Sequence, residues 1–515
     1  MVASPLLARS CALFACLSLV TGCKLLRDEP VIVDPGGGGQ SDWCDGSPAP
    51  VCDSSIVVAP DSPALLVTDP AVLAKLPLQD VLDRLLEDFN DPPTPREQLL
   101  RMLFDSNNNH DAGVFSHDYH CDDEENPAHA NGSAGDCPRA EGALALSDGF
   151  FTPGHPDHFY PVAIVDRIDL MPLDNSTCGE FRIVYAKESG KTDPDDRVFL
   201  IFEAALPNPE PWCEHSCRPV AEFWKSLEGE ESAGALGDRL RQFFLEGIPG
   251  FDAAIRLNNF GGSGFGGSGY YGANGQVRVS QHIDEHWELR EFSYRSHWLG
   301  PRFEPKFVGN NPMPHLFRAY YPDDAAQLSW FEQDFVSTNV ELLGRKSVSH
   351  QGMITSRDDL AGESEQGGDK INDYALVSKE NTGLRSAVDH QISVLGIGDE
   401  CPPDDPLDAE AILRRATMQS CAGCHAPSRF LGPERAIGCG VTWPDSLGDV
   451  HIDEHGDLSP ALRDVFLPHR AEVLTTYLQG CDPEAIEGNI GGPFGTGAQT
   501  KALRPGATLG GSVTH

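Results

Sequence analysis

Apolar residues recur with helical spacing near the start of the chain. Between residues 78 and 89 they occupy positions i, i+3, i+4, i+7, i+8 and i+11, which is one face of a helix. Thr94–Glu97 is a capping box with proline at the first helical position, and it predicts the start of a second helix that runs through Leu103. Further helical patterns occupy residues 219–227, 236–245 and 323–343, and another ends at Leu395.

From about residue 160 the pattern becomes typical of strands. Short runs rich in β-branched and aromatic residues are bounded by Asp, Asn, Pro and Gly turns. These runs cover residues 161–170, 181–186, 197–205, 276–283 and 286–294. Because helices flank the strands and do not alternate regularly with them, we expect an antiparallel sheet. The sequence therefore predicts an α+β fold over residues 56–395, in one or two domains.

This predicted body carries no recognisable catalytic motif. Residues 258–272 are very rich in glycine but lack the strand–turn–helix context and the lysine of a nucleotide loop, which favours a surface loop. Residues 105–116 space oxygen ligands as a calcium loop does, yet His110 replaces the required glycine and Ser116 the bidentate glutamate. A polar turn is the better interpretation there, and residues 117–137 are interpreted as an acidic surface loop.

The charge of the chain argues against nucleic acid as a partner. The 515 residues carry a formal net charge of −40, which repels both nucleic acid and anionic membrane surfaces. A solvated acidic surface is the simplest explanation of this charge. A docking surface for a basic redox partner protein, or weak Ca²⁺ sites, is the alternative.

The N-terminus predicts export and a lipid anchor. An apolar run over residues 11–20 follows Arg9 and is too short to span a membrane, as in a signal peptide. Val20–Cys23 resembles a bacterial lipobox, which implies removal of residues 1–22 and lipidation of Cys23; Lys24 favours the outer membrane of the cell envelope. Residues 23–55 are rich in Gly, Ser, Asp and Pro and predict a flexible tether, so lipid would be the only anchor.

The strongest chemical motif is Cys421-Ala422-Gly423-Cys424-His425. Two thiols three residues apart can each add to a vinyl group of one haem, and the adjacent histidine can bind the iron. The motif resembles the attachment site of class I c-type cytochromes. A helical pattern over residues 407–419 leads into it, as in that family. A short helix is predicted at 461–467, and after an interruption at Pro468 a second segment, 470–478, resembles the C-terminal helix that packs on the first helix in that family. The resemblance implies a small all-α haem domain over residues 396–485, followed by a glycine-rich disordered tail, 486–515.

Haem c would be held by Cys421 and Cys424, with His425 as the proximal iron ligand. The family usually supplies a methionine as sixth ligand, but the last methionine of this chain, Met418, precedes the motif. The loop in the equivalent place offers His455 and His451. We favour His455, then His451, then His469, and a five-coordinate iron remains open. Two imidazoles would give a lower potential than a His/Met pair.

The remaining cysteines are expected to form disulfides outside the cytosol. Of the 15 cysteines, Cys11 and Cys16 leave with the signal peptide, and ten remain after Cys23, Cys421 and Cys424 are set aside, an even number. Short loops suggest Cys44 with Cys52 and Cys121 with Cys137, although spacing does not fix connectivity. The alternatives to haem are that Cys421 and Cys424 form a disulfide, pair with Cys439 and Cys481, or bind zinc with histidines. The pentapeptide at 451–455 also occurs at 282–286, where a shared metal site is a minor alternative.

Three functions follow from these observations. The first is a lipid-anchored monohaem cytochrome that transfers single electrons to a redox partner protein, with no catalytic residues. The second is a haem oxidase or peroxidase with an open sixth position. The third is a haem-free, disulfide-rich surface lipoprotein that binds a partner. An electron carrier is favoured over a catalytic haem enzyme.

Overall fold

The core of the fold is an antiparallel sheet in which neighbouring strands follow one another along the chain. The computed structural model describes residues 52–88, 96–104, 141, 148–172, 174–213, 215–261, 275–283, 286–295, 302–306, 308–309, 311–319, 328–355, 364–365 and 372–481. The strand order is β1-β2-β3-β4-β5-β6-β7, and β8 pairs with β6. The bounds are β1 Leu66–Val67, β2 Phe159–Arg167, β3 Thr177–Lys187, β4 Val198–Pro207, β5 Gln276–Ile283, β6 His286–Arg295, β7 Arg302–Lys306 and β8 Ser364–Glu365. The predicted α+β class is confirmed, and the five predicted strands correspond to β2–β6.

Alternation along the strands gives the sheet two different faces. In β3, Phe181, Ile183 and Tyr185 are fully buried in the main hydrophobic core. Arg182 and Val184, between them, point to the opposite face, because successive side chains of a strand alternate. Cross-strand register preserves this separation, since Arg182 lies opposite Glu203 of β4 and Val184 opposite Ile201. One face is therefore aliphatic and aromatic, and the other carries charges among its apolar side chains.

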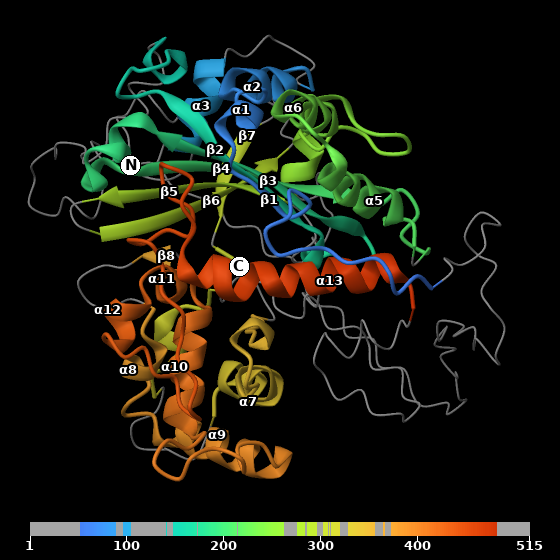
Figure 1. Cartoon of the computed structure of the whole chain (residues 1–515). Coiled ribbons are helices and arrows are strands. Elements are labelled where there is room, and N and C mark those ends of the chain that lie inside the picture. The colour runs from blue at the N-terminus through green and yellow to red at the C-terminus, as the bar shows by residue number, and fades with distance from the viewer. Residues whose placement is uncertain are drawn as a thin grey trace, which may run out of the picture. The chain divides into compact units, whose positions relative to one another are not determined.

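Helices cover the aromatic face (Figure 1). They are α1 Pro70–Leu73, α2 Leu78–Leu86, α3 Arg96–Phe104, α5 Arg218–Ser226 and α6 Ala233–Arg241. The apolar stripe that predicts a helix over residues 78–89 is the buried face of α2. From α5, Trp224 stacks on Phe181 of β3 at 5.6 Å between ring centroids, and Phe243 meets both rings edge-on. Each such ring pair stabilises the fold by about 0.5–1.5 kcal/mol beyond the free energy gained by burying the rings.

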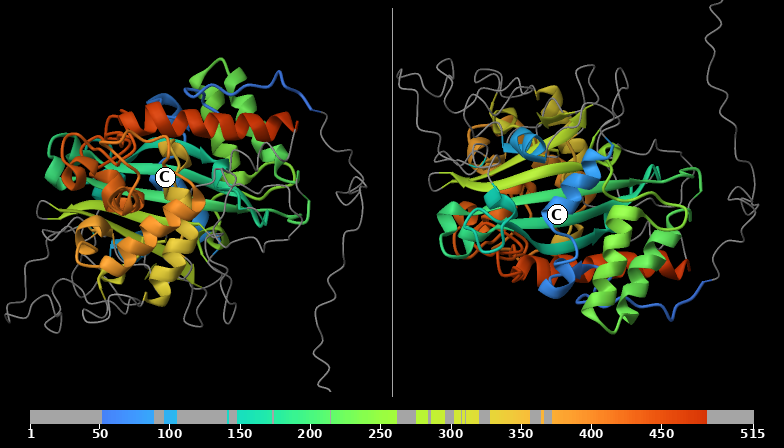
Figure 2. Two further views of the ribbon diagram at one scale, coloured as in Figure 1. Left: turned by 90° about the horizontal axis from the view of Figure 1, so that it is seen from below. Right: turned by 90° about the horizontal axis from the view of Figure 1, so that it is seen from above.

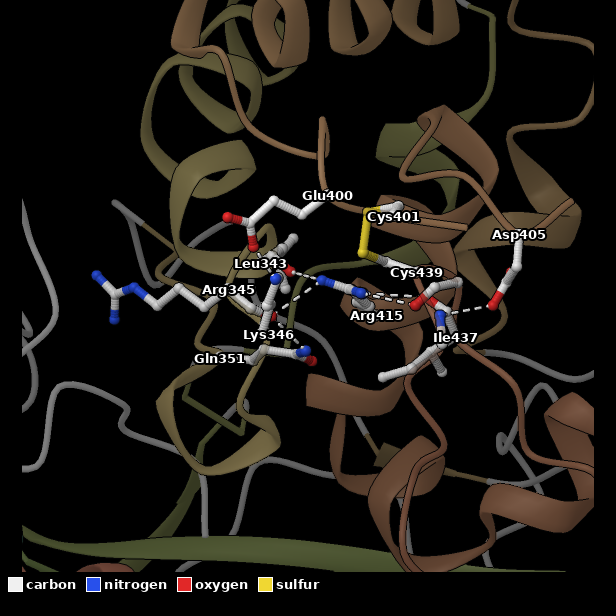
Figure 3. Close-up of a disulfide and its surroundings, with 12 residues drawn as sticks. Leu343, Arg345, Lys346, Gln351, Glu400, Cys401, Asp405, Arg415, Ile437 and Cys439 are labelled. Atoms are coloured by element: carbon white, nitrogen blue, oxygen red, sulfur yellow. Dashed lines mark hydrogen bonds and ion pairs between the residues drawn. A yellow bond between two sulfur atoms is a disulfide. The ribbon is translucent and has the colours of Figure 1, made fainter. Parts of the chain in front are cut away.

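A second hydrophobic core joins α7 Trp330–Leu343, α8 Tyr374–Val377, α9 Thr382–Leu395 and α10 Ala409–Gln419. A capping box of Ser329 and Glu332 begins α7. At one end of this core Arg415 is fully buried beside the Cys401–Cys439 disulfide (Figure 3). Its guanidinium donates to four backbone carbonyls, those of Leu343, Arg345, Ile437 and Gly438. Burial lowers the pKa of Arg415 to about 10. The predicted boundary near residue 396 thus falls inside a shared core.

The last helix differs from the expectation in its length and its partner. A π-turn over Leu462–Phe466 (η13) runs directly into α13 Leu467–Gln479, so the helix passes Pro468 without a break. Proline has no N–H to donate, and the wider hydrogen bonding of the π-turn accommodates it. The predicted interruption at Pro468 is wrong. Long and nearly straight in Figure 1, α13 packs mainly against α5 and the 3₁₀ turn η4 Ile168–Leu170 of the sheet body.

This packing also corrects the expected pairing of the first and last helices of the C-terminal segment. Apolar residues of α13 belong to the main core, whereas those of α10 between 409 and 416 belong to the second core. The reason is that α13 buries its apolar face on the helices beside the sheet. Cys52 bonds to Cys481 just after α13, which also overturns the suggested Cys44–Cys52 pairing. Two further views place α13 along one side of the sheet (Figure 2).

Candidate functional site

The Cys421–His425 motif forms its own short helix, α11. Ser420 is the N-cap, and its hydroxyl accepts a hydrogen bond from Gly423 N at 3.0 Å and donates one to Thr417 O at 2.7 Å. A Cβ on Gly423 would lie 1.9 Å from Thr417 O, so only glycine fits there. The turn from α10 into α11 is therefore fixed by Ser420 and Gly423.

Both motif cysteines are buried thiols. Cys421 is 8% exposed and Cys424 fully buried, and neither is disulfide-bonded. Cys439 pairs with Cys401 and Cys481 with Cys52, which rules out in this structure the alternative disulfides expected for the motif. Burial, and then the proximity of Cys421, raises the pKa of the Cys424 thiol well above its usual value. Disulfides also join Cys178 to Cys217, and Cys213 is disulfide-bonded.

His425 is held in one orientation by two contacts. Its Nδ1 lies 2.8 Å from Asp449 O, and because a carbonyl only accepts, Nδ1 carries the proton. Its ring stacks on Trp287 of β6, with centroids 4.5 Å apart and planes 19° apart. Burial lowers the pKa of His425, although the Asp449 carbonyl opposes this shift. The neutral ring then has its lone pair on Nε2.

The three histidines predicted as candidates for the sixth iron ligand lie in different surroundings. His451 lies beside the motif: Nε2 is 3.2 Å from Cys424 Sγ, Nδ1 is 2.8 Å from Ser459 Oγ, and its ring centroid is 4.8 Å from that of His425. His455 is exposed in the following turn, where its backbone N–H donates to Asp453. His469 lies on α13 against His350, with ring centroids 4.8 Å apart. Of the three, His451 alone is next to the motif.

A cavity opens beside the motif, between the charged face of the sheet and the C-terminal segment. The space measures about 940 Å³ with the open solvent at its mouth included. Cys421, His425 and His451 reach it from one side. The sheet supplies Val165, Arg182, Val184, Phe199, Ile201, Glu203, Arg278, Ser280 and Leu289, and the C-terminal segment adds Val450, Ile452, Leu462, Phe466 and Arg470.

The polar lining of the cavity carries an excess of positive charge. Arg278 pairs with Glu203 and Glu291 at 3.2 and 3.0 Å. Burial by itself would lower the pKa of Arg278, but these two carboxylates raise it above its usual value. Arg182 also pairs with Glu203, at 3.1 Å. The lining therefore contains more guanidinium groups than carboxylates.

Arg470 is the unusual member of this lining. It is 6% exposed, and within the described part of the chain its guanidinium forms no hydrogen bond or ion pair. Burial, together with the charge of Arg167, lowers its pKa well below the usual value, while Asp169 opposes the shift. A buried guanidinium without a bonded carboxylate is costly unless an anion binds it. The cavity is thus suited to an anionic, largely apolar ligand.

Several sequence predictions fall outside the described residues. They are the signal peptide with Cys23, the tether up to residue 51, the calcium-like loop at 105–116, most of the glycine-rich loop and the tail from residue 486. In the first copy of the repeated pentapeptide, His282 Nε2 lies 3.8 Å from Asp449 Oδ2. The side chain of His286 is not described. The first copy thus lies near Asp449, two residues before the second copy.

Comparison with known proteins adds no relative: no protein-family model, curated protein or solved structure matches the chain. Among the helices that the structure describes, none combines the length and apolar character needed to cross a membrane. The cavity and Trp287 are the parts of the site that motif reasoning missed. The signal for the cavity was the alternation of Arg182 and Glu203 with apolar residues in strands whose other face is largely apolar.

Proposed function

We propose that the chain is a lipid-anchored, extracytoplasmic electron carrier of the c-type cytochrome class, with one haem attached to Cys421 and Cys424. One observation carries the proposal: the C-x-x-C-H turn presents two unoxidised cysteines and a histidine whose Nδ1 is bound to a carbonyl. Histidines that bind metals usually donate their second N–H to a carbonyl or carboxylate in this way. His425 Nε2 is then the iron ligand.

The residues around the motif fit a haem. The cavity beside Cys421 and His425 is mostly apolar, and arginines line it. Haem is an apolar macrocycle with two carboxylates, so Arg470, which has no bonded carboxylate among the described residues, is suited to a propionate. His425 and His451 touch each other directly, so His451 has to move aside for a haem to bind. Because His455 is exposed, we now favour His451 as the sixth ligand.

The haem iron supplies a one-electron couple between Fe(II) and Fe(III). Trp287 and the Asp449 carbonyl fix the orientation of the His425 ring. The sheet forms one side of the cavity, and the arginines of the lining place positive charge where the haem propionates would lie. Positive charge and a low dielectric both favour the reduced, less charged iron, whereas two imidazoles favour the oxidised state. The acidic chain, with a net charge of −40, favours a basic redox partner protein.

A haem enzyme is the second candidate, because the cavity beside His425 is shared by the sheet and the C-terminal segment and partly open to solvent. A small substrate such as a peroxide could enter it if the iron lacked a sixth protein ligand. Addition of CO to the reduced protein and of cyanide to the oxidised protein separates the two candidates. Spectra unchanged by both indicate two protein ligands and electron transfer, whereas rapid binding of either favours the enzyme.

The proposal is tested by expressing the full chain with a cytochrome maturation system and staining a denatured gel for covalent haem. We expect the wild-type band to stain and a Cys421→Ser/Cys424→Ser variant not to. The matched control is Cys401→Ser/Cys439→Ser, which removes the nearby disulfide and leaves the motif intact. An unstained wild-type band from protein that is exported and folded would overturn the haem proposal and leave the haem-free binding lipoprotein.

A further inference from the structure

We infer that His350, His469 and Glu472 form a binding site for a divalent transition-metal ion, separate from the C-x-x-C-H motif. His350 ends the 3₁₀ turn η11 Val348–His350, and His469 and Glu472 lie one helical turn apart on α13. Each residue contributes a donor atom within 4.8 Å of the other two. The two imidazole rings meet edge to face at 89°.

The chemistry of these three donor atoms favours one class of metal ion. Two imidazole nitrogens and one carboxylate oxygen suit Zn²⁺ and neighbouring borderline metals, not Ca²⁺ or Mg²⁺, which prefer oxygen ligands throughout. Bonds of about 2.0–2.2 Å to one Zn²⁺ ion place donor atoms about 3–4 Å apart. An inward shift of less than about 1 Å therefore closes the site. Three protein ligands leave a position for water, and the exposed Glu472 provides the entry side.

The surroundings of His350 support a ligand there. Its Nε2 is buried and has no hydrogen-bond partner among the residues that the structure describes. The backbone carbonyl of His350 accepts a hydrogen bond from the Arg345 guanidinium at 2.8 Å. The backbone carbonyl of Arg345 in turn accepts hydrogen bonds from the side chains of Gln351 and Arg415, which fixes this loop. Figure 3 shows the side chains of Gln351 and Arg415 beside the backbone of Arg345. A ligand positioned by such a bonded loop loses little freedom when it binds a metal.

The site is independent of haem attachment. Neither His350 nor His469 lines the cavity, and both thiols belong to another part of the C-terminal segment. Zn²⁺ binding is measured by titration calorimetry on the metal-free full chain, expressed without haem maturation. We expect one tight site in wild type. In His350→Ala and in the conservative Glu472→Gln, affinity should fall at least about 100-fold, because loss of a direct ligand exceeds the ~10–100-fold cost of losing a supporting contact.

Two controls make the result specific. His390→Ala removes an exposed histidine of α9, and Cys421→Ser/Cys424→Ser removes the thiols; both should bind Zn²⁺ as wild type does. Co²⁺ bound at the site should give weak visible bands without the intense near-ultraviolet band of a thiolate ligand. Unchanged affinity in His350→Ala and Glu472→Gln, loss of the site in the cysteine variant, or a thiolate band would overturn the inference. Melting temperatures of the variants show whether a loss reflects unfolding.

Discussion

The indole of Trp287 and the imidazole of His425 are stacked 4.5 Å apart, although 138 residues separate them in the chain. Trp287 is itself fixed, because its Nε1 donates to Ser280 Oγ at 2.9 Å and its side chain is 1% exposed. Strand β6 thereby sets the orientation of a histidine from the motif helix.

Replacing Trp287 should affect stability and the haem differently according to the substitute. Trp287→Phe keeps a ring against His425 but loses the hydrogen bond to Ser280, a cost of about 1 kcal/mol in the free energy of unfolding. Trp287→Ala removes the ring and should cost about 3–5 kcal/mol. By admitting water beside the haem, it should also lower the reduction potential. Urea unfolding and potentiometric titration measure both quantities, and equal potentials in the two variants would contradict the stacking role.

Replacing His451 should change the ligation of the haem iron, whereas replacing His455 should not. With His451 as sixth ligand, His451→Ala opens the iron to CO, whereas His455→Ala leaves the visible spectrum unchanged. His451→Met offers a thioether in the same place and should raise the reduction potential, since thioether ligation favours reduced iron. Visible spectra with and without CO, and the potentials, test this. If His455→Ala opens the iron instead, the loop rearranges on haem binding and His451 is not the ligand.

Replacing Arg470 by methionine should separate its electrostatic role from its packing. Methionine fills similar space, and removal of a buried charge that has no bonded carboxylate among the described residues should leave the haem-free protein as stable or more stable. In the haem protein the same change removes positive charge near the propionates, so the potential should fall. Arg463→Met, at an exposed ion pair with Asp464, is the matched control and should leave the potential unchanged. A lower stability without a change in potential would refute the anion-binding role.

The half-buried His158 should account for part of the stability that the fold loses at low pH. Burial lowers its pKa; the nearby Lys191 and His155 act in the same direction, and Glu188 opposes them. Below about pH 6.5 the unfolded chain then binds a proton that the folded chain excludes, so this contribution to stability is lost as the pH falls. His158→Phe should reduce the loss of stability between pH 7.5 and pH 5, measured by urea unfolding of the haem-free protein.

The control for this pH experiment is His390→Phe, at an exposed position of α9. Comparing each variant with wild type cancels the contribution of the many carboxylates, which titrate in all three proteins. The prediction for His158 fails if its variant and wild type lose stability in parallel, or if the His390 variant shows the same reduction.

The sequence by itself determined the local features. Alternation of side chains predicted β2–β6, helical spacing predicted α2 and α10, and the C-x-x-C-H motif made Cys421, Cys424 and His425 the candidates for haem attachment. Each depends on neighbours within a few residues, so periodicity and spacing suffice to find it. The short strands β1 and β8 escaped prediction because two-residue strands carry no period.

Tertiary structure decided everything that depends on distant contacts. The burial of α13 beside the sheet, and not against α10, follows from where the larger apolar surface lies. The preference for His451 over His455 follows from the fold of one loop, which turns His455 to solvent. Trp287, Arg470 and the cavity belong to segments far apart in sequence that only the packed sheet brings to His425, because no local pattern records which faces meet.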